Sequence, residues 1–111
     1  MKQSDFAKHL THYLTVYLPA HQGAKNNTLY SYRDSFSLLI EYCRDHEDLP
    51  PEKLTVFHLN RELILRFLDW LENERGCRIA TRNHRLAAIR SFFSYLAVEA
   101  PEHIASHEKS R

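Results

Sequence analysis

The chain has 111 residues, of which 43% are hydrophobic, and its 15 lysines and arginines nearly balance its 14 aspartates and glutamates. This length is enough for one domain with a modest core, and two glycines are too few for the turns of a multi-stranded sheet, so we predict an all-α fold. The formal net charge of +1 excludes a polycation, so any binding of nucleic acid would need a local basic surface.

The first predicted helix follows Ser4, a residue type that commonly caps helices. Its apolar side chains recur at helical spacing and are Phe6, Leu10, Tyr13, Leu14, Tyr17 and Leu18. We expect Pro19 and Gly23 to close this helix and the polar segment with Lys25 to link it to the next. No apolar run here is long enough for a signal peptide or a membrane span, so we expect a cytoplasmic protein.

The second predicted helix is capped by Asn26 or Asn27, and its apolar stripe consists of Leu29, Tyr32, Phe36, Leu39, Ile40 and Cys43. Its N-terminus suits a phosphate, as the N-terminus of any helix does. After the Leu49-Pro50-Pro51 break, a connecting segment should lay a short apolar patch on the core: Leu54, Val56 and Phe57.

The third predicted helix starts at Asn60 and ends at Gly76 as its C-terminal cap. Its inward positions are Leu63, Ile64, Phe67, Leu68 and Leu71, with Trp70 at the edge. The fourth helix should run from Thr81 to about Ala100, where Pro101 stops it, and residues 101–111 should be a frayed tail. Its buried face is predicted at Leu86, Ile89, Phe92, Phe93 and Leu96.

No motif for metal binding or catalysis is present. The histidine pairs His9/His12 and His103/His107 have no cysteine nearby and fall short of the ligand count of a zinc site, so we predict no metal. There is no Gly-rich phosphate loop and no G-x-S-x-G sequence, and we predict no cofactor. Cys43 and Cys77 should be reduced thiols.

The arginines of the last helix carry the strongest functional signal. No acid occurs in residues 75–98, whereas acids are frequent in residues 41–74, which predicts one basic and one acidic surface. The basic residues of the span are all arginine, whose planar fork suits phosphates and guanine edges. Arg78, Arg82, Arg85 and Arg90 lie in or near the first half of the helix, the part that reaches base edges in recognition helices. For Arg90, beside the apolar stripe, an internal ion pair is a competing role.

Two stretches resemble a known family. Residues 27–33, NTLYSYR, followed by Phe36, are similar to the N-T-x-x-x-Y-R signature of the core-binding domain of tyrosine site-specific recombinases, which include the phage integrases. Residues 81–96, TRNHRLAAIRSFFSYL, resemble the last helix of that domain, and residues 67–72 fit the segment between them. The resemblance covers roughly Ser4 to Glu99, and its two main pieces occur in the right order.

The resemblance implies a four-helix SAM-like orthogonal bundle over residues 1–100, followed by a tail or linker start at 101–111. In that family the second and fourth helices contact double-stranded DNA at the core recombination site, and the first helix often packs on another protomer. The residues and the resemblance together predict the following DNA-binding positions: Lys25, Asn27, Thr28, Tyr32, Arg33, Arg78, Thr81, Arg82, Asn83, Arg85 and Arg90.

The strand-transfer chemistry of the family belongs to a second domain that this chain lacks, so we predict no catalytic residue and no small-molecule substrate. Asp34 stands where many members carry a second basic residue, which argues against tight binding by this domain alone. Two alternatives stay open. One is a helical protein-interaction module whose arginines are merely solvated, and the other is a stand-alone DNA-binding regulator.

Overall fold

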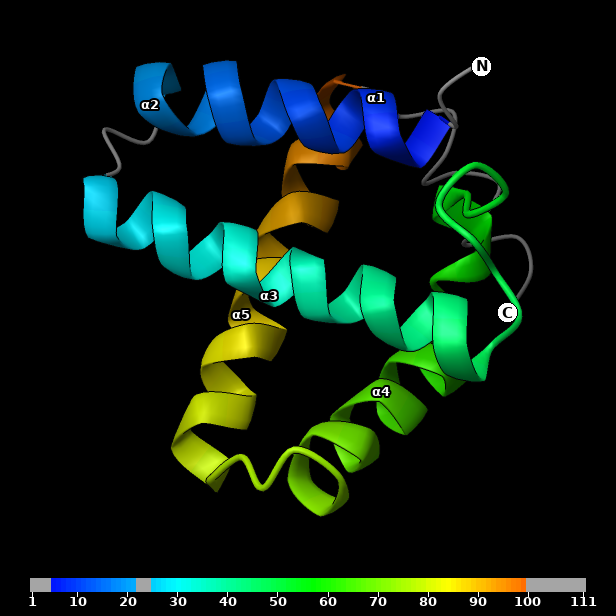
Figure 1. The fold of residues 1–111 in the computed structure, drawn as a ribbon. Coiled ribbons are helices and arrows are strands. Elements are labelled where there is room, and N and C mark those ends of the chain that lie inside the picture. The colour runs from blue at the N-terminus through cyan, green and yellow to red at the C-terminus, as the bar shows by residue number, and fades with distance from the viewer. Residues whose placement is uncertain (1–4, 22–24, 100–111) are drawn as a thin grey trace. The chain divides into compact units, whose positions relative to one another are not determined.

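The computed structural model describes residues 5–21 and 25–99, and every regular element in these ranges is helical (Figure 1). The all-α prediction is therefore confirmed, with the four expected helices in the expected order. The chain divides between Thr55 and Val56 into two compact units. Several predictions concern residues outside the described ranges: the cap at Ser4, the stops at Gly23 and Pro101, and the tail 101–111.

The first unit begins with a helix that changes its winding midway. Its parts are α1 (Asp5–His12), the π-helical segment η1 (Tyr13–Tyr17) and α2 (Leu18–His21). The N–H of Leu18 donates to the carbonyl of Tyr13, five residues back, which is the π-helical pattern. The prediction that Pro19 closes this helix is wrong, since the helix continues to His21. The wider turn directly before the proline gives its ring room that a regular α-turn would deny.

The second long helix of this unit is α3 (Asn26–His46). The predicted cap at Asn26 or Asn27 is wrong, because the N-cap is Lys25 and no side chain caps this helix end. Lys25 has an extended backbone, and its carbonyl accepts the N–H of Leu29 at 3.0 Å. Both asparagines consequently lie inside the first turn, with their side chains exposed.

The first helix and α3 meet through aromatic rings. Tyr13 is fully buried and meets Phe36 edge-on, with 6.3 Å between the ring centroids. Half of the predicted stripe of α3 is buried and half is half-buried, and outside the stripe Ser35 and Tyr42 are buried. Their polar atoms are paired, since Ser35 Oγ donates to the carbonyl of Ser31 at 3.0 Å and Tyr42 donates its hydroxyl to Glu47 Oε2. Satisfied hydrogen bonds let these two polar side chains enter the core at little cost.

The second unit starts with a 3-10 turn, η2 (Val56–His58), which leads into α4 (Arg61–Asn73). Val56 and Leu59 are buried, whereas Phe57, predicted to lie on the core, is 46% exposed. Residues three apart share one side of a 3-10 turn, so the turn directs Val56 and Leu59 inward and Phe57 outward.

The predictions for α4 hold at its start and along its length. Asn60 is the N-cap, and its Oδ1 accepts the N–H of Leu63 at 2.9 Å. All five predicted core positions are buried, and Trp70 is half-buried at the edge. The end differs, because Glu74 is the C-cap and Gly76 lies two residues beyond it. Gly76 has a φ of 64°, a left-handed conformation that glycine adopts without strain and that turns the chain toward the last helix.

The last helix, α5 (Ile79–Glu99), begins two residues before the predicted start at Thr81. Its first turn is closed by a hydrogen bond of 2.9 Å from the N–H of Arg82 to the carbonyl of Arg78. Ile89, Phe92 and Leu96 are buried as predicted, whereas Leu86 and Phe93 are only half-buried. Tyr95 is also buried, and its ring stacks on Phe92 with 6.0 Å between centroids. The second half of α5 is therefore the part that enters the core.

Candidate nucleic-acid interface

Arg78, Arg82 and Arg85 continue the buried stripe of α5 toward the N-terminus of the helix; we call these three residues the arginine row. The stripe of Ile89, Phe92 and Leu96 and the arginine row together follow alternating steps of four and three residues. Residues at such steps share one side of an α-helix. The exposed fraction of the side chains increases toward the N-terminus of the helix, from buried Ile89 through half-buried Arg85 and Arg82 to exposed Arg78. One side of α5 thus changes from apolar to cationic without a break.

Arg82 contacts an acid that the sequence analysis missed. Its Nε lies 2.8 Å from Oε1 of Glu72, near the end of α4, and its Nη1 donates to Oδ1 of Asn83 at 3.2 Å. The side chains of Arg82 and Glu72 are 25% and 37% exposed. The absence of acids from residues 75–98 therefore does not mean that no acid lies near their side chains. The pairing depends on how α4 and α5 pack, which sequence spacing does not show.

Asn83 and Arg90 lie on a different flank of α5 from the arginine row. They are seven residues apart, two turns of the helix, and both are exposed. The predicted competing role of Arg90 in an internal ion pair has no support, because Arg90 has no hydrogen bond or ion pair with any other described residue. Thr81 is exposed on the side of the arginine row. The structure thus separates the predicted residues of α5 into two groups.

The predicted residues in the other unit gather at the start of α3. Lys25, Asn27, Thr28 and Arg33 are exposed, and Tyr32 is half-buried. The first turn of α3 contains no acid, so its backbone N–H groups and the positive end of its dipole are not neutralised locally. The side chains of Lys25 and Arg33 form no ion pair with other described residues. This helix end is open to an anion, although Asp34 is exposed next to Arg33.

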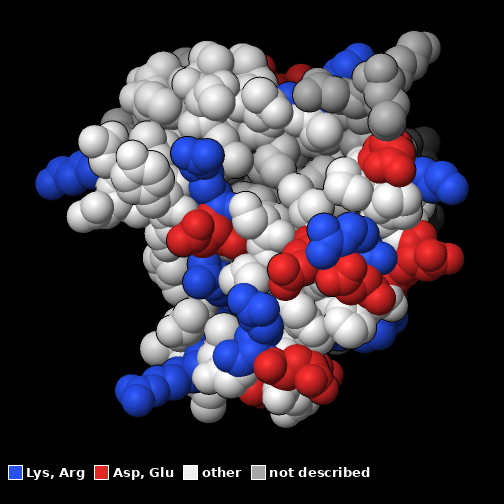
Figure 2. Space-filling view, in the orientation of Figure 1, with Lys and Arg blue, Asp and Glu red and all other residues white. Residues whose placement is uncertain are grey.

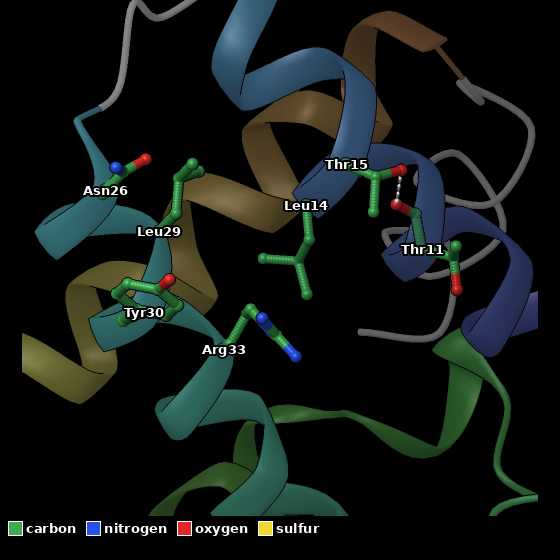
Figure 3. A pocket seen from close by; sticks show the side chains of 7 residues that line it. All are labelled: Thr11, Leu14, Thr15, Asn26, Leu29, Tyr30 and Arg33. Carbon is green, nitrogen blue, oxygen red and sulfur yellow. Dashed lines mark hydrogen bonds between the residues drawn. The ribbon is translucent and has the colours of Figure 1, made fainter.

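A pocket of about 420 Å³ lies between the first helix and the start of α3 (Figure 3). It is lined by Thr11, Leu14, Thr15, Asn26, Leu29, Tyr30 and Arg33. Leu14 and Leu29 supply apolar surface, and Arg33, the only charged residue of the lining, reaches from α3 toward the first helix (Figure 3). Both threonine hydroxyl groups donate to helix carbonyls, Thr11 to Ala7 at 2.8 Å and Thr15 to Thr11 at 2.7 Å.

Comparison with known proteins identifies the family to which this fold belongs. The family model described as "Phage integrase, N-terminal SAM-like domain" matches residues 10–100. The chain belongs to this family. The predicted SAM-like fold and the resemblance to phage-type integrases are thereby confirmed.

Two relatives of the SAM-like domain come from Sinorhizobium fredii (strain NBRC 101917 / NGR234). "Putative integrase/recombinase y4rC" is 37% identical over 108 residues, which are 97% of this chain and 32% of that protein. "Putative integrase/recombinase y4rD" is 44% identical over 92 residues, which are 83% of this chain and 33% of that protein. The chain thus spans about a third of the length of the curated relatives it matches. No solved structure matches it significantly.

On the surface of this SAM-like domain, acidic and basic side chains lie closer together than their separation along the chain suggests. On the face drawn in Figure 2, acidic side chains lie next to basic ones. Glu72 and Arg82 form one such pair of opposite charges. Within residues 5–21 and 25–99, no three histidine, cysteine or acidic side chains come together as metal ligands would. None of the helices in the described part is both long and apolar enough to cross a membrane.

Proposed function

We propose that this chain binds double-stranded DNA as the core-binding domain of an integrase or recombinase, using the starts of α3 and α5. The arginine row is the observation that carries this proposal. A helix that presents guanidinium groups where its buried stripe ends offers planar, multidentate donors to phosphates and to guanine edges. The membership in the SAM-like family of phage integrases supports the same function.

The start of α3 would supply a second contact with the DNA backbone. Lys25 and Arg33 are exposed cations without ion pairs in the described part, and the first turn of α3 contributes unneutralised N–H groups. Asn27, Thr28 and Tyr32 add neutral donors on the same stretch. In protein–DNA complexes such phosphate contacts fix orientation, whereas base contacts from a recognition helix select the sequence.

We assign no catalytic step to the residues of this chain. The relatives are about three times as long as the matched region, and we propose that DNA strand transfer, the activity that the family resemblance implies, resides in their remaining parts. In this proposal residues 1–100 bind the core recombination site and residues 101–111 lead toward a catalytic domain.

An NMR titration of the isotope-labelled 111-residue chain with a short duplex at low salt tests the proposal. Shifts should concentrate in residues 25–33 and 78–90 and fade as salt rises, because phosphate contacts release counterions. An unperturbed arginine row at saturating duplex would contradict DNA binding through α5.

The pocket beside the first helix favours a second, compatible role as a contact with another recombinase protomer. Leu14 and Leu29 give it an apolar surface, and Val16 on the same helix is 48% exposed. Double replacement of Arg82 and Arg85 by alanine separates the two roles. It should abolish DNA binding and leave any self-association intact, whereas loss of both would show that the variant is misfolded. Circular dichroism of the variant identifies that case.

A further inference from the structure

The guanidinium of Arg82 has two contacts with described residues. Oε1 of Glu72 lies 2.8 Å from Nε in an ion pair without hydrogen-bond geometry, and Asn83 accepts from Nη1 at 3.2 Å, which leaves the donors of Nη2 and the second donor of Nη1 without a described partner. The guanidinium is planar and rigid, so fixing Nε also fixes the direction of the Nη1–Nη2 edge. That edge can form the paired hydrogen bonds by which arginine recognises O6 and N7 of guanine.

The Glu72–Arg82 pair differs from an ordinary surface ion pair. The side chain of Arg82 is 25% exposed and that of Glu72 37%, whereas those of Arg44 and Asp45 are 54% and 47% exposed. Arg44 and Asp45 are neighbours on one helix, but Glu72 and Arg82 join α4 to α5. Partial burial weakens screening by solvent, and attachment to α4 ties the arginine to a second rigid element.

We propose that Glu72 is a positioning residue for DNA recognition: it orients Arg82 so that its Nη1–Nη2 edge faces a guanine in the major groove. The inference rests on the proposed function, because it assigns a role within that same site. It also implies a compromise, since the carboxylate that orients Arg82 repels nearby phosphates. Glu72 should therefore improve base discrimination while it weakens affinity for DNA of any sequence.

Three variants separate the charge of Glu72 from its side-chain oxygen near Nε. Glu72→Gln keeps an oxygen beside Nε and removes the charge, whereas Glu72→Ala removes both. Glu74→Ala is the matched control, because it removes one exposed acid two residues away that has no ion pair in the described part. All three variants should bind non-specific duplex slightly more tightly. Only Glu72→Ala should lose discrimination at one guanine. The preference for that guanine should fall roughly twofold to tenfold, because Arg82 would then have to be ordered on binding, and ordering one long side chain weakens affinity by about this factor.

The geometry can be checked first without DNA. In the free 111-residue chain, the Nε–H resonance of Arg82 should be shifted and protected from exchange, retained in Glu72→Gln and lost in Glu72→Ala. An Arg82 resonance that is unchanged in Glu72→Ala would overturn the proposal at this stage, whatever the protein does with DNA.

Discrimination is then measured with a pool of duplexes carrying a randomised core, sequenced before and after capture by each variant. We expect the wild-type chain to enrich a guanine whose preference disappears in Arg82→Ala, weakens in Glu72→Ala and persists in Glu72→Gln and Glu74→Ala. Failure to retain any duplex at low salt would refute the proposed function itself. Retention with an unchanged guanine preference in Glu72→Ala, or with no preference linked to Arg82, would refute only the role of Glu72.

Discussion

Replacing Arg90 by glutamine tests how phosphate contacts are distributed over α5. Arg90 is exposed and has no ion pair in the described part of the chain, so its full charge is available to a phosphate. About four to six phosphate contacts predict a slope of roughly −4 to −5 for the logarithm of affinity against that of salt concentration. Loss of one contact should make the slope shallower by about 0.9. A fourfold rise in salt would then weaken wild-type binding about 3.5-fold more than binding of the variant.

The matched control for Arg90→Gln is Arg61→Gln, which changes the net charge equally in the same unit. Arg61 is exposed in the first turn of α4, eleven residues before Glu72, or about 16 Å along the helix axis from the residue that contacts the arginine row. Fluorescence anisotropy of a labelled duplex over a salt series gives both slopes. Equal changes in the two variants would mean that only net charge matters, and an unchanged slope for Arg90→Gln would remove Arg90 from the interface.

Four further predictions concern the cap of α4, the core and Cys43. Asn60→Ala should lower the free energy of unfolding by about 1 kcal/mol in urea titrations, with Asn60→Asp close to wild type, because only alanine lacks the capping oxygen. Phe92→Ala, at a fully buried position, should cost about 3–5 kcal/mol, and a loss below 1 kcal/mol would contradict its place in the core. Burial, with a smaller contribution from Glu47, raises the pKa of Cys43 from 9.0 to about 12, so iodoacetamide at pH 8 should modify half-exposed Cys77 first. Because the raised pKa favours the protonated thiol in the folded state, this group should leave stability unchanged below pH 9 and lower it between pH 9 and 12.

The sequence was sufficient to predict the helices because their apolar residues repeat with the helical period. The core positions of α4 and its start at Asn60 followed from spacing and residue type alone. Both are local properties, since a cap needs only a side chain three residues from its partner N–H and a stripe needs only regular steps. The cationic start of α5 and its apolar end were visible in the sequence for the same reason.

Local rules failed where a neighbouring turn changed the backbone. Pro19 stays inside a helix because the π-helical segment precedes it, and Phe57 turns outward because η2 is wound more tightly than an α-helix. The spacing of the apolar residues predicts neither the π-helical segment nor the 3-10 turn. The burial of Tyr42 likewise depends on the nearby carboxylate of Glu47, which accepts a hydrogen bond from the tyrosine hydroxyl.

The sequence by itself determined which residues we propose as DNA contacts, through the family motif, the arginines and the absence of acids near them along the chain. Only the tertiary structure decided which of these residues act together. It half-buried Arg82 and Arg85, left Arg78 and Arg90 exposed, and brought Glu72 from α4 to Arg82. The physical reason is that an ion pair forms between side chains that are close in space, and packing of two helices sets that distance independently of their separation along the chain.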